Sequence, residues 1–318
     1  MEEFIAAGVV PKRWHIGDVI ITRIVELGGF PVPASLTFAD LDIGQVTAQK
    51  WLQPHFATED GRLYISVQAF LIESRGRRII VDTCVGNDKE RESAHFNMLQ
   101  GRFLEDLAEA GFPAESIDTV LCTHLHVDHV GWNTKLVDGA WVPTFANARY
   151  LFGRTEWDHW NKERHDQIDG DVLGDSVMPV VEAGLVDLVE TNHSLTDEVR
   201  LIPTPGHTPG HVSVEIESRG FRAVITGDVM HHPLQCGAPD QASNFDSDRE
   251  AARGMRHRFL DTYADQPVAV FGTHFAHPTA GWIKRDGQVW RFEVDAETCN
   301  EAEAFLTQGG QRWASSNG

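Results

Sequence analysis

The chain has 318 residues, of which 42% are hydrophobic and 23% charged, and its formal net charge at pH 7 is −20 with the histidines neutral. This composition can bury the core of one large α/β domain or of two small ones. The negative charge repels nucleic-acid phosphates and anionic membrane surfaces, and no run of Lys or Arg offsets it, so we expect neither a nucleic acid nor a membrane as partner.

The N-terminus and the cysteines give expectations about location. Residues 1–5 lack a basic region followed by an apolar stretch and a cleavage site, and no apolar run is long enough to span a bilayer. The four cysteines have no C-x-x-C spacing, so we expect reduced thiols in a cytoplasmic protein. Without repeats or a linker, we expect one domain over residues 1–318, with an N-terminal arm at 1–16 and a flexible tail at 308–318.

The first hundred residues contain signals for a strand, a loop, a hairpin and a helix. Residues 19–26 have strand composition, and the Gly- and Pro-rich residues 28–38 indicate a loop. Apolar side chains of that loop, Phe30 and Phe38 among them, either pack on the domain or form an apolar wall beside a site. Residues 64–73 and 77–82 predict a hairpin, and residues 103–111 a helix that ends at a glycine.

The strongest pattern is a cluster of three imidazoles and a carboxylate within residues 124–129. The apolar and β-branched residues 117–122 predict a buried strand that delivers this cluster to a loop. His124 and His126 are two apart and share one direction if the chain stays extended. Asp128 and His129 follow after the chain turns and could serve a second metal. Imidazole suits zinc, copper, iron or nickel, and a carboxylate adds charge.

Three later segments repeat the arrangement of a strand that ends in a candidate ligand. Residues 199–203 lead into a Pro- and Gly-rich loop with His207, residues 223–227 stop at Asp228, and residues 268–273 stop at His274, with His277 as the alternative. An aromatic-rich stretch between the motifs contains a predicted strand at 148–152. The first aromatic residue of this stretch, Trp132, follows the ligand loop directly and is a candidate substrate contact. Residues 288–292 predict an edge strand.

Taken in this order, the motifs resemble those of the metallo-β-lactamase superfamily, whose signature is H-x-H-x-D-H. The resemblance covers roughly residues 17–294. It implies an α/β fold, a four-layer αβ/βα sandwich with the metals at one edge. Residues 82–86 resemble the family's D-T-G turn, with Cys84 where glycine is usual. Asp82 is then expected to orient a ligand histidine, the alternative being a plain turn-forming aspartate.

The resemblance also implies a pair of divalent ions, expected to be zinc, with manganese, iron or cobalt as alternatives. One ion would be held by His124, His126 and His207, the other by Asp128, His129 and His274, and Asp228 would bridge them. His211 matches a position that is usually not a ligand. His231 and His232 follow Asp228 closely, and one of them could reach the site, but neither matches a ligand position.

A hydroxide shared by two ions would attack a carbonyl or phosphoryl group, and Asp128 would act catalytically by moving the proton to the leaving group. We expect a small-molecule substrate, a lactone of the acyl-homoserine lactone type, with a phosphotriester of the methyl parathion hydrolase type as the alternative. Glyoxalase II fits less well, because no basic cluster for glutathione is evident. The candidate contacts for an acyl or aryl group are Phe30, Phe38, Trp132 and Phe275. The sequence does not fix the oligomeric state; a homodimer is compatible with it.

Overall fold

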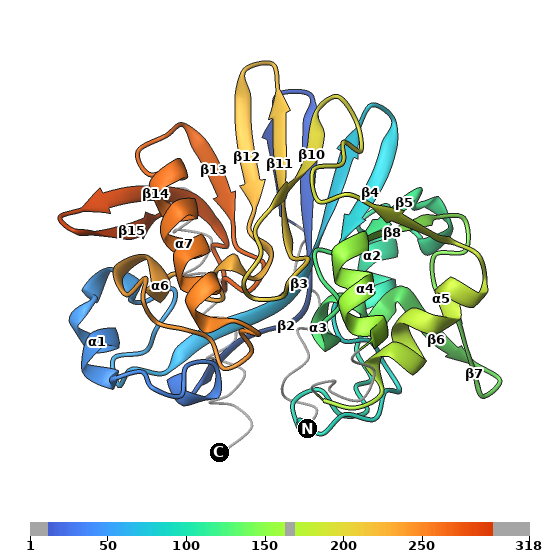
Figure 1. Ribbon diagram of the computed structural model, residues 1–318, viewed down its shortest axis with the longest axis horizontal. Helices are drawn as coiled ribbons and strands as arrows, with labels where there is room; N and C mark the ends of the chain where they lie inside the picture. The colour runs from blue at the N-terminus through green and yellow to red at the C-terminus, as the bar shows by residue number, and fades with distance from the viewer. Residues whose placement is uncertain (1–11, 163–168, 295–318) are drawn as a thin grey trace.

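Two β-sheets lie at the centre of the computed structural model, which describes residues 12–162 and 169–294 (Figure 1). The first sheet has seven strands, in the order β1 (Arg13–Ile16), β2 (Val19–Val32), β3 (Leu63–Ser74), β4 (Arg77–Val81), β5 (Thr119–Leu121), β8 (Arg149–Gly153) and β9 (Val186–Val189). The second has six, in the order β10 (Val199–Pro203), β11 (Val212–Ser218), β12 (Phe221–Ile225), β13 (Val268–Phe271), β14 (Ala280–Asp286) and β15 (Val289–Glu293). A separate hairpin is formed by β6 (Thr134–Val137) and β7 (Ala140–Pro143).

Helices cover the outer face of each sheet. Beside the first sheet lie α2 (Phe103–Glu109), α4 (Arg154–Lys162) and α5 (Met178–Glu182); beside the second lie α1 (Ile43–Ala48), α6 (Leu234–Gly237) and α7 (Arg249–Tyr263) (Figure 1). The short α3 (Val127–Val130) lies between these two halves. Single helical turns occur at η2 (Ala34–Leu36), η3 (Lys50–Leu52), η4 (Ala114–Ser116), η5 (Gly131–Asn133), η6 (Leu173–Val177, a π-helix) and η7 (Gly227–Val229).

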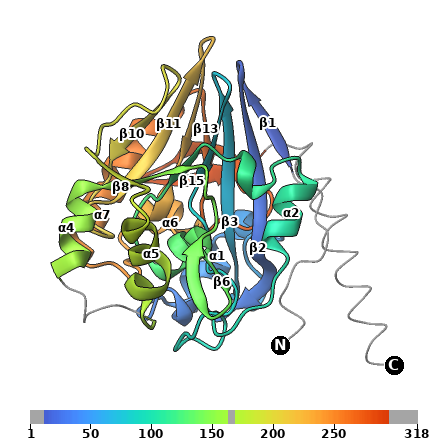
Figure 2. The same cartoon turned by 90° about the vertical axis from the view of Figure 1, so that its right-hand side faces the viewer.

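The alternation of side chains along the strands explains why both sheets are buried on both faces. In β4, Ile79 and Val81 belong to the core between the sheets, whereas Ile80 points to the core under the outer helices. In β12, Ile225 packs between the sheets and Val224 packs towards α7. Successive residues of a strand point to opposite faces, so apolar runs supply both cores. Figure 2 shows β2 and β3 beside β11 and β13. The helix–sheet–sheet–helix layering confirms the predicted four-layer sandwich.

Strand direction brings the candidate ligands to one edge. Parallel pairing joins β4 to β5 and β12 to β13, so the carboxyl ends of these strands point the same way within each sheet. Asp82 follows β4, the histidine cluster follows β5, Asp228 follows β12, and His274 follows β13. These four strand ends carry most of the site, as the sequence pattern predicts.

Several local predictions need correction. Residues 28–32 are not a loop, because β2 continues to Val32 through two register shifts at Val25/Leu27 and Leu27/Phe30, and Gly29 takes a φ of +80° there. Part of the predicted N-terminal arm is a strand, since Arg13–Ile16 pairs with β2 as β1. The predicted tail at 308–318 lies outside the described residues. The edge position of β15 is confirmed.

The cysteines and the helices bear on the expectations about disulfides and membrane spans. Cys84, Cys122 and Cys236 are buried free thiols, while Cys299 falls outside the described residues. Among the helices of residues 12–162 and 169–294, none combines the length and the apolar character needed to cross a bilayer.

Candidate metal centre

The H-x-H-x-D-H segment changes conformation in its middle. The backbone at His126 is extended, with φ −74° and ψ 162°, and α3 begins at the next residue. Asp128 and His129 therefore lie on a helical turn, whereas His124 and His126 precede it. This is the turn that the sequence predicts, and it sends the two halves of the motif towards two different sets of partners.

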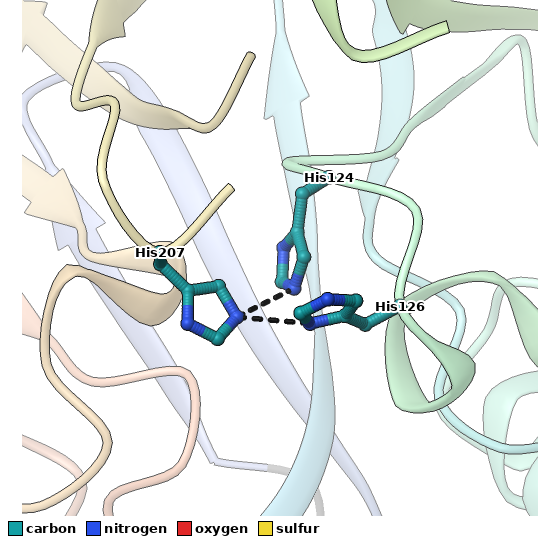
Figure 3. A group of neighbouring side chains, drawn as sticks. All are labelled: His124, His126 and His207. Atoms are coloured by element: carbon teal, nitrogen blue, oxygen red, sulfur yellow. Dashed lines mark hydrogen bonds between the residues drawn. The ribbon is translucent and has the colours of Figure 1, made fainter. Parts of the chain in front are cut away.

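Three histidines meet at the first set. His207 Nε2 lies 3.2 Å from His124 Nε2 and 2.9 Å from His126 Nδ1, with the His207 ring facing the other two from the opposite sheet (Figure 3). Burial lowers the pKa of all three histidines well below the ordinary value. Neutral imidazoles whose lone pairs point at one spot repel each other unless a cation lies between them, so this donor set fits a metal ion.

A second set combines a carboxylate with two histidines. His274 Nε2 lies 3.3 Å from His129 Nε2 and 3.6 Å from Asp128 Oδ2. Burial alone would lower the pKa of His129, but the nearby carboxylates outweigh it and hold this pKa well above the ordinary value. The same balance raises the pKa of His274 to about 9. These carboxylates thus favour positive charge at this place, which a divalent ion would supply.

Asp228 contacts both sets. Its Oδ2 lies 3.4 Å from His207 Nε2, and its Oδ1 lies 3.2 Å from His274 Nε2. Opposite charge from the surrounding histidines holds the pKa of Asp228 well below its usual range, although burial acts in the other direction. One buried carboxylate therefore reaches both sets, which is the geometry of a bridging ligand.

Oxygen acceptors fix the direction of three ligand rings. Asp82 Oδ2 accepts from His129 Nδ1 at 2.9 Å, and the carbonyl oxygen of Ser66 accepts from His274 Nδ1 at 2.9 Å. Asp246 Oδ1 lies 3.0 Å from His207 Nδ1. Each bond uses Nδ1 and leaves Nε2 for a metal. Asp82 has the predicted orienting role. Asp246 was not found from the sequence, because no motif marks its loop.

The remaining histidines of these loops have separate positions. His277 Nδ1 lies 3.4 Å from Arg23 Nη2 and belongs to none of the potential metal-ligand groups of the described chain, whereas His274 does. His211 Nε2 accepts from the backbone N–H of Asp228 at 2.7 Å, so this nitrogen is occupied by a hydrogen bond to the backbone. Of the two histidines that follow Asp228, His231 reaches the site: it is buried, and its Nε2 lies 3.2 Å from Asp228 Oδ2.

The aromatic residues predicted as substrate contacts are mostly interior. Trp132 donates from Nε1 to Glu26 at 2.6 Å and stacks on Phe103, and Phe38 and Phe275 are fully buried in the core of the second sheet. Phe30 lies in β2, opposite Ile65. Their burial argues against a contact role for Trp132, Phe38 and Phe275. These residues were proposed because they are near the ligands in sequence, which does not determine the direction of a side chain.

One exposed apolar side chain lies beside His231, and a second lies on a segment hydrogen-bonded to the residue that precedes the first. Phe245 is 37% exposed, and its ring centroid is 6.3 Å from that of His231. Leu36 is 45% exposed on the neighbouring loop, and its carbonyl oxygen accepts from Asn244 Nδ2 at 3.0 Å. We call Leu36 and Phe245 the apolar rim. Leu36 belongs to the segment for which the sequence left open an apolar wall beside a site, whereas Phe245 was missed because no motif marks its loop.

Comparisons with known proteins point in one direction. The model of the metallo-beta-lactamase superfamily matches residues 65–274, more than half of the chain. An N-acyl homoserine lactonase of Bacillus sp. is 27% identical over 223 residues, which are 66% of this chain and 82% of the relative. The corresponding enzyme of Bacillus cereus is 26% identical over 231 residues, covering 68% and 84%.

Solved structures share the fold over nearly the whole chain. The hydrolase AbOPH of the beta-lactamase superfamily superposes with a TM-score of 0.73 at 25% identity, covering 91% of this chain and 99% of the other. AidC, a dizinc quorum-quenching lactonase in complex with a product, superposes with a TM-score of 0.71 at 19% identity, covering 90% and 97%. At such identity, the AidC likeness establishes the fold alone.

Proposed function

We infer the function from one premise: the chain belongs to the metallo-beta-lactamase superfamily and is a metal-dependent hydrolase. We propose that it holds two divalent ions, most favourably zinc, and opens the ring of an acyl-homoserine lactone. The observation that carries this proposal is the position of Asp228, whose two oxygens lie 3.4 Å from His207 and 3.2 Å from His274. A carboxylate that reaches both donor sets supports a paired site over two independent ones.

The donor sets favour zinc. His124, His126 and His207 would hold one ion, and Asp128, His129 and His274 the other. Imidazole with carboxylate is a common zinc environment. A pair of bound ions lowers the pKa of a shared water and polarises a carbonyl oxygen.

Asp128 is suited to proton transfer because its side chain is more open than those of Asp228 and His274. Its side chain is 17% exposed, whereas those of Asp228 and His274 are 4% and 5% exposed. A carboxylate at the open side can take a proton from the attacking water and deliver it to the alkoxide oxygen that leaves when the ring opens. The proposed mechanism therefore needs no serine or cysteine nucleophile.

His231 is suited to stabilise the developing oxyanion. Its side chain is buried, and within the described residues its Nδ1 has no hydrogen-bond partner. Its Nε2 lies 3.2 Å from the bridging carboxylate, so a substrate carbonyl placed over the centre would come within reach. A preorganised N–H donor of this kind strengthens as charge develops on the oxygen.

The substrate class follows from charge and from the apolar rim. The chain carries a formal charge of −20, which disfavours polyanionic substrates. Phe245 offers apolar contact next to His231, which suits an acyl chain. The lactonase relatives support the same class. A neutral phosphotriester meets the conditions of charge and apolarity and is the second candidate.

The test compares kcat/KM for an acyl-homoserine lactone, an aryl lactone and a neutral phosphotriester on one metal-loaded preparation. We expect the acyl-homoserine lactone to lead. A phosphotriester that leads by more than about tenfold, which corresponds to roughly 1.4 kcal/mol of transition-state preference, would contradict the lactonase assignment.

A further inference from the structure

A buried glutamate joins the two loops that carry the three-histidine set. Glu156 lies in the first turn of α4 and is 1% exposed. Its Oε1 accepts from the backbone N–H of Leu125 at 3.2 Å, and its Oε2 accepts from the backbone N–H of Gly210 at 3.0 Å. Leu125 lies between His124 and His126, and Gly210 lies three residues after His207. One carboxylate thus links ligand loops from both sheets.

Two further contacts tie Glu156 to the same place. Trp160 Nε1 donates to Glu156 Oε1 at 2.7 Å, and the Trp160 ring packs edge-on against His126 at 5.4 Å between centroids. A side chain added at Gly210 would collide with the backbone of Glu156, so this loop rests directly on α4. The indole therefore connects the glutamate to a ligand ring as well as to the loops.

A carboxylate is chemically suited to this position. The N–H groups of Leu125, Gly210 and Trp160 converge on Glu156, and an ionised carboxylate is an acceptor only. The first turn of a helix also favours negative charge. Burial raises the pKa of Glu156, so its surroundings oppose the negative charge that these hydrogen bonds favour. Such a costly group is expected where the geometry it enforces matters.

We propose that Glu156 is a positioning residue that sets the separation of the two loops, and thereby the affinity of the His124/His126/His207 set for its metal ion. Among the described residues, no hydrogen bond joins Glu156 to a proposed ligand side chain, in contrast to Asp82 and Asp246, which bond to individual rings. Its carboxylate instead bonds to the backbone of the loops that carry the proposed ligands. The inference rests on the proposed metal pair. It adds that Glu156 affects the affinity for one ion of the pair and not for the other.

The test is the metal affinity of Glu156→Gln. The amide NH₂ must face a donor on one side or the other, so the substitution replaces one loop bond by a clash of donors at nearly constant volume. We expect one of two bound ions to lose about 10–100-fold in affinity while the second is retained, as is typical when a partner behind the ligands is removed. Equilibrium dialysis against a chelator and the visible spectrum of the cobalt(II)-substituted protein measure this without an activity assay.

Glu198→Gln is the matched control. Glu198 is a buried glutamate that accepts from Ser74 and Ser218 hydroxyls at 2.8 and 2.7 Å, at the strand ends remote from the metal centre. Its substitution is expected to affect the stability of the metal-free protein and to leave both affinities unchanged. If Glu156→Gln does not fold, Glu156→Asp, with a carboxylate one methylene shorter, carries the same expectation.

The outcomes are separable. Wild-type affinity for both ions in the Glu156 variant would overturn the inference alone. Equal weakening of both ions, with a stability loss like that of the Glu198 variant, would reduce Glu156 to a structural role and also overturn it. A wild-type protein that binds no metal pair would remove the proposed function itself.

Discussion

Asp246 and His207 are hydrogen-bonded at 3.0 Å although 39 positions separate them in the chain. The other oxygen of Asp246 lies 3.5 Å from the buried guanidinium of Arg256 and accepts from the backbone N–H of Ser243 at 2.9 Å. The carboxylate is therefore held from behind and presents one oxygen to the ring. This fixes His207 with Nδ1 protonated and Nε2 directed at the centre.

We expect Asp246→Asn to weaken the binding of one metal ion by about 10–100-fold, because the charged partner that raises the basicity of His207 is lost. Competition with a chromophoric chelator measures the change. Asp240→Asn is the control, since Asp240 makes a similar 2.8 Å bond to His257 on the surface, away from the metal centre. Equal effects of the two substitutions would contradict a specific role of Asp246.

Substitution of the proposed proton carrier should separate chemistry from folding. Asp128→Asn is expected to keep the fold and to lower kcat by about two to four orders of magnitude, the range of a general acid–base contribution. Metal content must be measured on the same sample, because Asp128 is also a proposed ligand. Asp138→Asn, in the exposed β6–β7 turn, is the control. Near-wild-type turnover with a full metal complement would exclude the role.

Removal of the metals should be visible in stability as well as in activity. We expect about two ions per chain by elemental analysis, and loss of hydrolysis after chelation. An ion present at one hundred times its dissociation constant stabilises the folded state by about 2.7 kcal/mol, so the chelated protein should unfold at lower denaturant concentration. Zinc or manganese should restore both properties. A stoichiometry near zero after metal is added back would rule out the paired site.

The residues that the fold brings together as potential metal-ligand groups could be predicted, because they lie in short local motifs at strand ends. The pattern of residues 124–129 implies the turn between His126 and Asp128 without any tertiary information. Asp82 could be predicted because it ends a hairpin strand next to the ligand strand. His274 and His277 could not be separated by pattern, since both follow β13; the contact of His277 with Arg23 distinguishes them.

The substrate side of the site could not be predicted, because it depends on side-chain direction and on loops distant in sequence. Trp132 directly follows the ligand motif, yet its indole turns inward to the buried Glu26. Phe245 has no motif around it and reaches the centre through the fold of its loop. The bulges in β2 were missed for a related reason: Gly28 and Gly29 are loop signals in isolation, and only pairing with β3 shows that the strand continues.

A histidine outside the ligand sets should make stability depend on pH. His232 is buried, its Nε2 donates to the carbonyl oxygen of Phe56 at 2.9 Å, and its Nδ1 accepts from the N–H of Leu234 at 3.0 Å. Burial lowers the pKa of His232 from 6.5 to about 4. The unfolded chain therefore binds a proton near pH 6.5 that the folded chain refuses until about pH 4, and stability is lost as the pH falls through this interval.

For His232 alone, this linkage amounts to a loss of about 2 kcal/mol between pH 7 and pH 5. His232→Gln, which lacks the titrating ring, should start less stable at pH 7 and lose less on acidification. Denaturant unfolding at the two pH values measures the difference between wild type and variant. His15→Gln, at an exposed position of β1, should leave the pH dependence unchanged. Parallel pH profiles for wild type and His232→Gln would contradict the prediction.

The apolar rim makes the substrate preference testable. Phe245 is 37% exposed beside His231, so an acyl chain bound over the centre can cover its ring. Phe245→Ala should raise KM for a long-chain acyl-homoserine lactone by about tenfold, equivalent to about 1.4 kcal/mol of lost apolar contact. It should change KM for a short-chain lactone less, and leave kcat within a few-fold, because the ring contacts no reacting group. Phe221→Ala is the control: Phe221 is 62% exposed, at the opposite end of β12 from Asp228. A chain-length preference that is the same in wild type and Phe245→Ala would place the acyl chain elsewhere.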